Sequence, residues 1–220
     1  TIAGEHVYVG CTDGSIYCLQ ASDGQLAWRF RAGEEERLVM IDGALESAWP
    51  VHGSVLVQNN LVYFAAGRSS FLDGGILVYA IDRLTGSVVH KSRASGRNLK
   101  TGEQPKGIIK GFDMPSGLPD VLSSDGSNVY MRDLMFDDQC TQQPSAQRHL
   151  FSPTGFLDDS WWHRGYWLFG DSFSSGWGGW HRMGNQVPAG RLMVFDDTTI
   201  YGFGRNFIPS GNAGQWRKGE

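Results

Sequence analysis

Two segments of the sequence repeat one another and decide the fold. Residues Ile16–Trp28 read IYCLQASDGQLAW, and residues Val78–His90 read VYAIDRLTGSVVH, 62 positions further along the chain. Each begins with an apolar run that contains a tyrosine, passes through a polar turn that includes a glycine, and continues as a second apolar run. Short apolar runs bounded by glycine-bearing turns are typical of β-hairpins. The two segments therefore predict the same pair of antiparallel strands, used twice.

A second signature connects these segments with two further places in the chain. Four short runs place a β-branched residue directly before a tyrosine, at Tyr8, Tyr63, Tyr130 and Tyr201. The last three are preceded by another apolar run and a turn of Asn, Asp or Gly, residues that adopt the positive φ of tight hairpins. A complete repeat is therefore predicted to have four strands. The first unit is expected to lack its first strand, and the last unit to stop after its second.

These repeats predict an all-β fold. A meander of four short antiparallel strands that recurs along a chain is a blade of a β-propeller, which buries its faces against neighbouring blades. We place the units at approximately 1–33, 54–93, 119–157 and 162–208, with inserts at 34–53 and 94–118. A propeller closes its ring with about four to eight complete blades. Because the expected first and last units do not complete a blade between them, these four blades or part-blades predict an incomplete ring and a fragment of a longer chain.

Composition narrows the class of protein. The 220 residues include 30 glycines and eight tryptophans, and the formal net charge is −4. Glycine at about twice its average share is typical of a chain with many turns. The apolar content is too high for disorder, and no apolar run approaches the roughly 18 residues of a membrane span. The weak acidity argues against a nucleic-acid partner.

The segments Val7–Phe30 and Val55–His90 resemble the tryptophan-docking repeats of the PQQ-like, quinoprotein-type β-propellers, and are similar to the BamB-like scaffold propellers among them. The second segment carries the Tyr-Ala-x-Asp and Thr-Gly steps of the repeat, whereas His90 stands where the family usually has tryptophan. The resemblance implies a bacterial protein of about seven or eight blades, located in the periplasm or outside the cell. It also implies that Trp28 packs between blades, and we expect Tyr8, Tyr63, Tyr130 and Tyr201 to serve the same structural docking.

The same resemblance raises the question of a cofactor. Quinone-dependent dehydrogenases of this fold hold PQQ with a calcium ion and typically carry two adjacent cysteines. The three cysteines of this chain, Cys11, Cys18 and Cys140, are not adjacent. We expect Cys11 to face Ile16 and Cys18 to face Val9 across their hairpin, so the first two are not cross-strand partners. No cofactor is therefore predicted, and PQQ with calcium belongs only to an alternative interpretation.

The most unusual segment runs from residue 158 to 182 and contains five of the eight tryptophans. The favoured interpretation is that its rings pack within or between blades. An alternative is contact with a glycan or another ligand, because flat rings beside charged groups are suited to stacking on sugars; the residues that would make it are Trp161, Trp162, His163, Trp177, Trp180 and His181. A metal site is a further alternative, with His163, His181, Asp158, Asp159 and Asp171 as its ligands.

Four other places have less to suggest a function. The acid run Glu34–Glu36 is predicted to be a solvated loop. His52 next to Gly53 and Ser54 lacks the Gly-x-Ser-x-Gly elbow and the placed acid of a nucleophilic site. Asp73-Gly74-Gly75 is predicted to be a hairpin turn rather than a calcium loop, and the loop 96–117 to be an exposed connection whose basic residues are offset by acids.

The sequence therefore predicts a non-catalytic propeller scaffold or binding module for protein or glycan contact in an extracytoplasmic protein. The alternative is part of a quinoprotein dehydrogenase or of a carbohydrate-active propeller enzyme. No residue is assigned a catalytic, cofactor-binding or metal-binding role.

Overall fold

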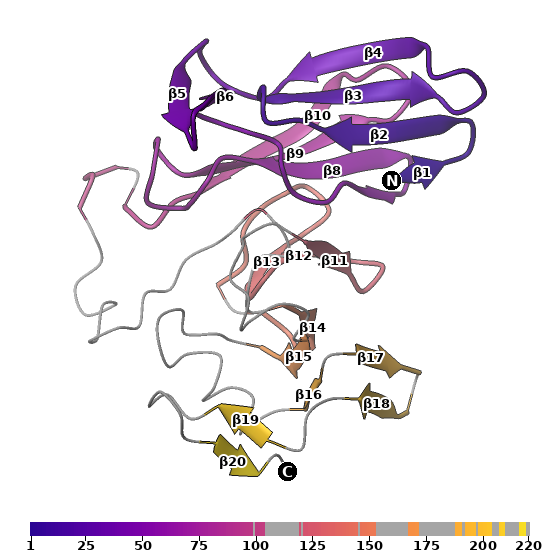
Figure 1. Ribbon diagram of the computed structural model, residues 1–220, viewed down its shortest axis with the longest axis vertical. Helices are drawn as coiled ribbons and strands as arrows, with labels where there is room; N and C mark the ends of the chain where they lie inside the picture. Colours follow the sequence, from indigo (N-terminus) through magenta and orange to yellow (C-terminus); the bar gives the residue numbers. More distant parts are fainter. Residues whose placement is uncertain are drawn as a thin grey trace.

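The fold was analysed in a computed structural model, which describes residues 1–98, 100–103, 119, 121–144, 146–152, 167–171, 188–190, 192–196, 198–203, 207–209 and 216–218. Every regular element in these ranges is a β-strand, and every strand pairing is antiparallel. The first two four-stranded sheets lie together at one end of the molecule, and the last hairpins lie at the other (Figure 1).

The first sheet contains four strands in sequence order: β1 (Ile2–Ala3), β2 (His6–Gly10), β3 (Ser15–Gln20) and β4 (Leu26–Arg31). The prediction that this unit lacks its first strand was wrong. Ile2 and Ala3 pair with Val7 and His6 across a turn in which Gly4 adopts a φ of 61°. A two-residue strand is too short to leave an alternating pattern in the sequence, so only its hydrogen-bonding partner reveals it.

The second sheet repeats this arrangement with β7 (Leu56–Gln58), β8 (Leu61–Ala66), β9 (Ile76–Asp82) and β10 (Val88–Ala94). Asn59 and Asn60 join its first two strands with φ of 51° and 62°. Two consecutive residues of positive φ are typical of the tight turn that matches the twist of a hairpin. The four-strand unit predicted from the repeats is therefore present twice in succession.

Among the described residues, the later sheets have fewer strands. They comprise β11 (Leu122–Ser124), β12 (Val129–Met131) and β13 (Leu134–Phe136); β14 (His149–Phe151), β15 (Trp167–Gly170) and β16 (Ala189–Gly190); β17 (Leu192–Phe195) and β18 (Ile200–Phe203); and β19 (Phe207–Pro209) and β20 (Trp216–Lys218). Two of the predicted tyrosine hairpins are β11–β12 and β17–β18. Residues 157–162 are the predicted boundary between the third and fourth units. The sheet β14–β15–β16 contains one strand from before this boundary and two from after it. The limits of the four units stay predictions.

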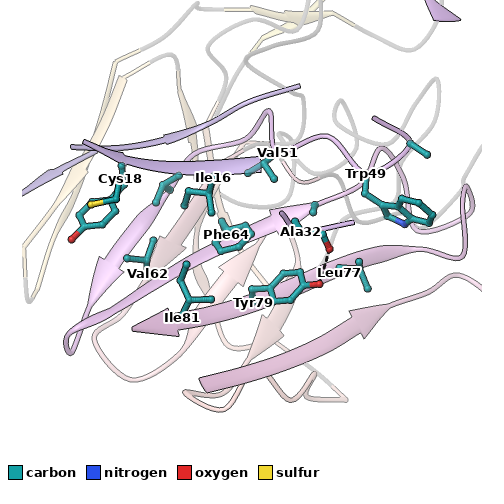
Figure 2. Close-up of a cluster of buried hydrophobic side chains, with 14 residues drawn as sticks. Ile16, Cys18, Ala32, Trp49, Val51, Val62, Phe64, Leu77, Tyr79 and Ile81 are labelled. Atoms are coloured by element: carbon teal, nitrogen blue, oxygen red, sulfur yellow. Dashed lines mark hydrogen bonds between the residues drawn. The ribbon is translucent and has the colours of Figure 1, made fainter. Parts of the chain in front are cut away.

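The core lies between successive sheets. One cluster joins the first sheet to the second, with Ile16 and Cys18 facing Val62, Phe64 and Ile81 (Figure 2). A second cluster lies on the opposite side of the second sheet, against β12 and β13. Alternate residues of β8 and β9 belong to the two clusters, and nearly all are buried. A sheet buried on both faces by its neighbours is the packing expected of a propeller blade.

The register of the first hairpin corrects one expectation about the cysteines. Cys18 pairs with Tyr8 rather than with Val9, and Ile16 pairs with Gly10 rather than with Cys11. Cys11 lies beyond the end of β2, where its N–H donates to the Ser15 carbonyl at 2.9 Å. The turn is one residue wider than the sequence suggested. All three cysteines are free thiols in the structure.

Candidate functional site

The insert between the first two sheets forms a hairpin that the sequence-based interpretation missed. It consists of β5 (Leu38–Ile41) and β6 (Ala44–Ser47), and it projects beside the ends of the two sheets (Figure 1). Asp42 and Gly43 close it with φ of 48° and 83°. An Asp-Gly pair between two apolar runs is a strong hairpin signal, so this element was detectable in the sequence.

One face of this hairpin is apolar and open to solvent. Met40 and Leu45 are cross-strand partners, and both are 64% exposed. Leu38 lies two residues before Met40 on the same face and is 56% exposed. Val39, on the opposite face, packs against the core cluster between the sheets. The hairpin therefore uses one face for anchoring and leaves three large apolar side chains uncovered on the other.

Trp49 anchors the hairpin to the second sheet. Its indole is only 4% exposed, and Nε1 donates a hydrogen bond to the Asp73 carbonyl at 3.2 Å. The Arg37 guanidinium lies over the indole, 4.9 Å from the ring centroid, and forms an ion pair with the Asp73 carboxylate. Asp73 lies in the β8–β9 loop, where the sequence predicted a turn at Asp73-Gly74-Gly75. The start of β5 is therefore fixed to the second sheet, although β5 follows the first sheet in the sequence.

The acid run before β5 makes further ion pairs. Glu34 accepts hydrogen bonds from Arg93 at 2.5 Å and from Lys91 at 3.1 Å, both on β10. Glu36 pairs with Arg31 on β4 at 2.7 Å. The hydrogen bonds from Arg93 and Lys91 lower the pKa of the Glu34 carboxyl. The run is exposed, as predicted for a solvated loop, and its charges also connect the first and second sheets.

A polar cluster lies at the base of β6. Arg68 Nη2 donates to the Ser47 carbonyl at 2.9 Å and lies 3.3 Å from the Glu46 carboxylate. Burial lowers the pKa of His52, and the positive charge of Arg68 lowers it further. Ser54 Oγ accepts a hydrogen bond from the Leu122 N–H at 2.7 Å. The Arg68 contacts connect β6 to the segment that follows β8, and the Ser54 contact connects the start of the second unit to β11.

The tyrosines and tryptophan expected to dock blades make two kinds of contact. Tyr8 and Trp28 both donate to the Arg83 carbonyl of the next sheet, at 3.0 and 3.1 Å. Tyr63 donates to the Asp138 carbonyl, beyond β13, at 3.1 Å. Tyr130 and Tyr201 instead reach an aspartate of their own hairpin.

Those local contacts fasten the turn that precedes each strand. Tyr130 Oη donates to Asp125 at 2.6 Å, and Tyr201 Oη to Asp196 at 3.3 Å. In both hairpins the same aspartate also accepts backbone N–H groups of its turn. The four tyrosines of the shared signature therefore form two pairs. Tyr8 and Tyr63 contact the next unit, whereas Tyr130 and Tyr201 contact the turn of their own hairpin.

The predicted glycan-contact residues Trp161, Trp162, His163, Trp177, Trp180 and His181 lie outside the described residues, as do Asp158 and Asp159. From that segment the structure describes only Trp167–Asp171, in which Leu168 is buried on β15 and Asp171 is exposed. Within the described ranges, no three His, Cys, Asp or Glu side chains converge as metal ligands would.

Successive four-stranded antiparallel sheets, packed face to face and carrying a hairpin on one connection, define a propeller-type protein. The described part of the chain has no helix long and apolar enough to cross a bilayer. The sequence profile of the family described as outer membrane protein assembly factor BamB matches residues 1–131. The chain belongs to this family.

Three solved structures illustrate the likeness. The quinohemoprotein alcohol dehydrogenase ADHIIG from Pseudomonas putida HK5 is 18% identical over 61% of this chain and 20% of its own, with a TM-score of 0.43. A europium-containing methanol dehydrogenase is 15% identical over 64% of this chain and 23% of its own, with a TM-score of 0.33. BamB from Moraxella catarrhalis is 13% identical over 96% of this chain and 65% of its own, with a TM-score of 0.36.

This chain thus spans about a fifth of the length of the two dehydrogenases and 65% of that BamB. No curated protein matches it.

Proposed function

We propose that the chain is a non-catalytic propeller scaffold of an extracytoplasmic protein, and that it contacts a partner protein through the β5–β6 hairpin. The observation that carries this proposal is the open apolar face of Leu38, Met40 and Leu45 on a hairpin whose other face is anchored. The description of the family, an outer membrane protein assembly factor, supports a role in protein contact and a location outside the cytoplasm.

The energetics favour a partner for this face. Covering a large apolar side chain stabilises a protein or a complex by about 1.5–3 kcal/mol relative to leaving it in water. Single exposed apolar residues are ordinary, whereas adjoining ones rimmed by polar groups mark contact sites. On the opposite, anchored face, Arg37 and Glu46 form ion pairs with Asp73 and Arg68 that keep the hairpin in place.

Site-specific photocrosslinking in the host cell tests the proposal. A benzoylphenylalanine is introduced at Met40 in the full-length protein, and the matched control carries it at Leu84. Leu84 is similarly exposed, at 58%, but lies in the β9–β10 turn. We expect a light-dependent adduct with a discrete protein from position 40 and none from position 84. Equal yields from both positions, or none from either, contradict the proposal.

The other activities considered for this fold give different outcomes. Polysaccharide retention that is lost in Trp177→Ala and Trp180→Ala, with the melting temperature unchanged, indicates a glycan-binding module instead. A saturable spectrum of added PQQ with calcium, together with dye reduction by alcohols or sugars, indicates a quinoprotein dehydrogenase. Either result, without a crosslink at position 40, replaces the scaffold proposal.

A further inference from the structure

We infer that the outer edge of β5 binds an extended segment of the partner as an added β-strand. This inference rests on the proposed function, since the same hairpin makes the contact, and it specifies how the contact is made. It follows from two features of β5: the direction of its backbone hydrogen-bonding groups and the lack of charge along the strand.

The direction of the backbone groups follows from the register. In an antiparallel pair, directly opposed residues alternate between those that exchange hydrogen bonds and those that do not. The Ala48 N–H donates to the Arg37 carbonyl at 2.9 Å. Val39 with Glu46 and Ile41 with Ala44 are therefore hydrogen-bonded pairs, whereas the N–H and C=O groups of Leu38 and Met40 point away from β6.

The opposite edge of the hairpin confirms this alternation. Ser47 is the partner of Leu38, so its backbone groups must also point outward. Its N–H donates to the Thr12 carbonyl at 2.9 Å, which fastens the β6 edge to the β2–β3 turn. Among the described residues, none bonds to the outward backbone groups of Leu38 or Met40. The β6 edge is therefore bonded at Ser47, whereas the β5 edge is open at both Leu38 and Met40.

Apart from the short length of β5, which has four residues, its edge also lacks the usual protection against strand addition. Natural edge strands are generally blocked by Lys, by Pro, by an inward-pointing charge or by a bulge. The four residues of β5 are Leu, Val, Met and Ile, paired with β6 without a register shift. An open edge whose outward-bonding residues also carry exposed apolar side chains suits a peptide in β-augmentation, where the backbone supplies affinity and alternate side chains supply specificity.

The chemistry of the edge restricts the occupant. A strand added beside Leu38 and Met40 places alternate side chains next to theirs, so those side chains are expected to be apolar. Carboxylates flank the strand, with Glu36 before it and Asp42 in its turn, and the Glu36 side chain is 73% exposed despite its ion pair. We therefore assign the edge to an extended segment whose centre has alternating apolar residues and no charge, and whose ends carry basic residues.

Peptide binding to the full chain tests this assignment. The probe is a fluorescein-labelled peptide of alternating Val and Thr with Lys at both ends, and its binding is followed by fluorescence anisotropy. The control peptide has the same sequence with N-methyl groups on alternate backbone nitrogens, which removes the donors of one edge. We expect saturable binding of the probe and at least a tenfold weaker affinity for the control. Equal affinity of the two peptides overturns the inference, as does the absence of saturable binding.

Two variants locate the contact on β5. Met40→Pro removes an outward N–H that the β5–β6 pair does not use, so the hairpin is expected to remain and probe affinity to fall at least tenfold. Met40→Ala keeps the N–H and loses only the side chain, so its affinity is expected to lie between those of Met40→Pro and the unaltered chain. Near-ultraviolet circular dichroism checks folding. If Met40→Pro does not fold, the N-methylated peptide still decides the question on the unaltered chain.

The outcomes separate this inference from the proposed function. A crosslink at position 40 without peptide binding leaves the scaffold proposal intact and overturns strand addition. Peptide binding without a crosslink supports the open edge and contradicts a cellular partner at the hairpin. A second copy of the chain is the competing occupant, and concentration-dependent dimerisation that Met40→Pro abolishes would assign the edge to self-association and overturn the peptide assignment.

Discussion

The Trp28 indole of the first sheet donates a hydrogen bond to the backbone carbonyl of Arg83 in the second, at 3.1 Å. Tyr8 donates to the same oxygen at 3.0 Å, and its ring lies 5.9 Å from the Trp28 ring, centroid to centroid. The carbonyl belongs to the turn between β9 and β10, which also contains Gly86. One turn of the second sheet thus receives two aromatic donors from the first.

Removing one donor from this shared carbonyl should cost less than removing both. Trp28→Phe and Tyr8→Phe are each expected to lower the free energy of unfolding by about 1–2 kcal/mol, the scale of one lost hydrogen bond with some packing. In the double variant the carbonyl loses both aromatic donors, so the loss is expected to exceed the sum of the single losses by about 1 kcal/mol. Urea unfolding measures all three. Simple additivity would show that the two donors act independently.

Gly86 and Gly24 allow the packing of Trp28 to be separated from backbone strain. They occupy equivalent positions in the repeat, with φ of 70° and 74°. A Cβ at Gly86 would lie 2.9 Å from two carbons of the Trp28 ring, whereas a Cβ at Gly24 would meet nothing within 4 Å. Both alanine variants should lose about 1–2 kcal/mol to the positive φ. Gly86→Ala should lose about 1–3 kcal/mol more, from the clash.

Thermal and urea unfolding of the two alanine variants provide the comparison. Gly24→Ala serves as the matched control, because it introduces the same backbone conformation without the ring. Equal losses in the two variants would mean that the β9–β10 turn moves away from Trp28 at little cost.

Acid should weaken the β11–β12 hairpin through Asp125. Burial alone would raise the pKa of this carboxyl, but hydrogen bonds from Tyr130 at 2.6 Å, Asn128 N at 2.7 Å and Ser127 N at 2.8 Å hold it well below its usual value. A carboxyl whose pKa is lowered by folding stabilises the protein at pH values above its pKa in the unfolded chain, which is near 3.9. This stabilisation is lost as the pH falls through the pKa of the folded state.

The variant Asp125→Asn should therefore be less stable than the unaltered chain at pH 7. We expect its free energy of unfolding to be lower by about 1 kcal/mol, a small value because the side chain is solvent-accessible. This difference should shrink steadily between about pH 5 and pH 2. Asp23→Asn is the control, since the Asp23 carboxylate accepts a single described hydrogen bond, from Gln25 N at 3.0 Å. Unfolding free energies across this pH range would contradict the prediction if both variants followed the same curve.

The contact between Arg37 and Asp73 should control the order of the β5–β6 hairpin. Arg37→Met removes the ion pair and the cation over Trp49, so the Val39 and Ile41 amides should exchange hydrogen faster. Global stability should change by less than about 1 kcal/mol, because Arg37 is exposed. Arg31→Met, which breaks only the exposed pair with Glu36, should leave those amides unchanged. Hydrogen exchange followed by mass spectrometry measures both, and equal exchange in the two variants would contradict the role of Arg37.

Local patterns were sufficient to predict the repeated strands but not every element between them. The two segments repeated at an offset of 62 residues predicted β3–β4 and β9–β10, because strand alternation and turn preference depend on neighbouring residues. The hairpin β5–β6 was also predictable from Asp42-Gly43 but was overlooked beside the acid run. The strand Ile2–Ala3 was not predictable, because two residues carry no period and acquire their identity from their pairing with β2.

The sequence by itself determined that this protein is built from antiparallel blades and where their turns fall, since periodicity and the positive φ of Gly, Asn and Asp act over a few residues. Tertiary structure decided which groups meet across long separations. Trp28 meets Arg83, and Arg37 meets Asp73, because the sheets stack face to face and the insert folds back onto the second. The open edge of β5 was also decided there, because whether a backbone group is paired depends on what lies beside it in space.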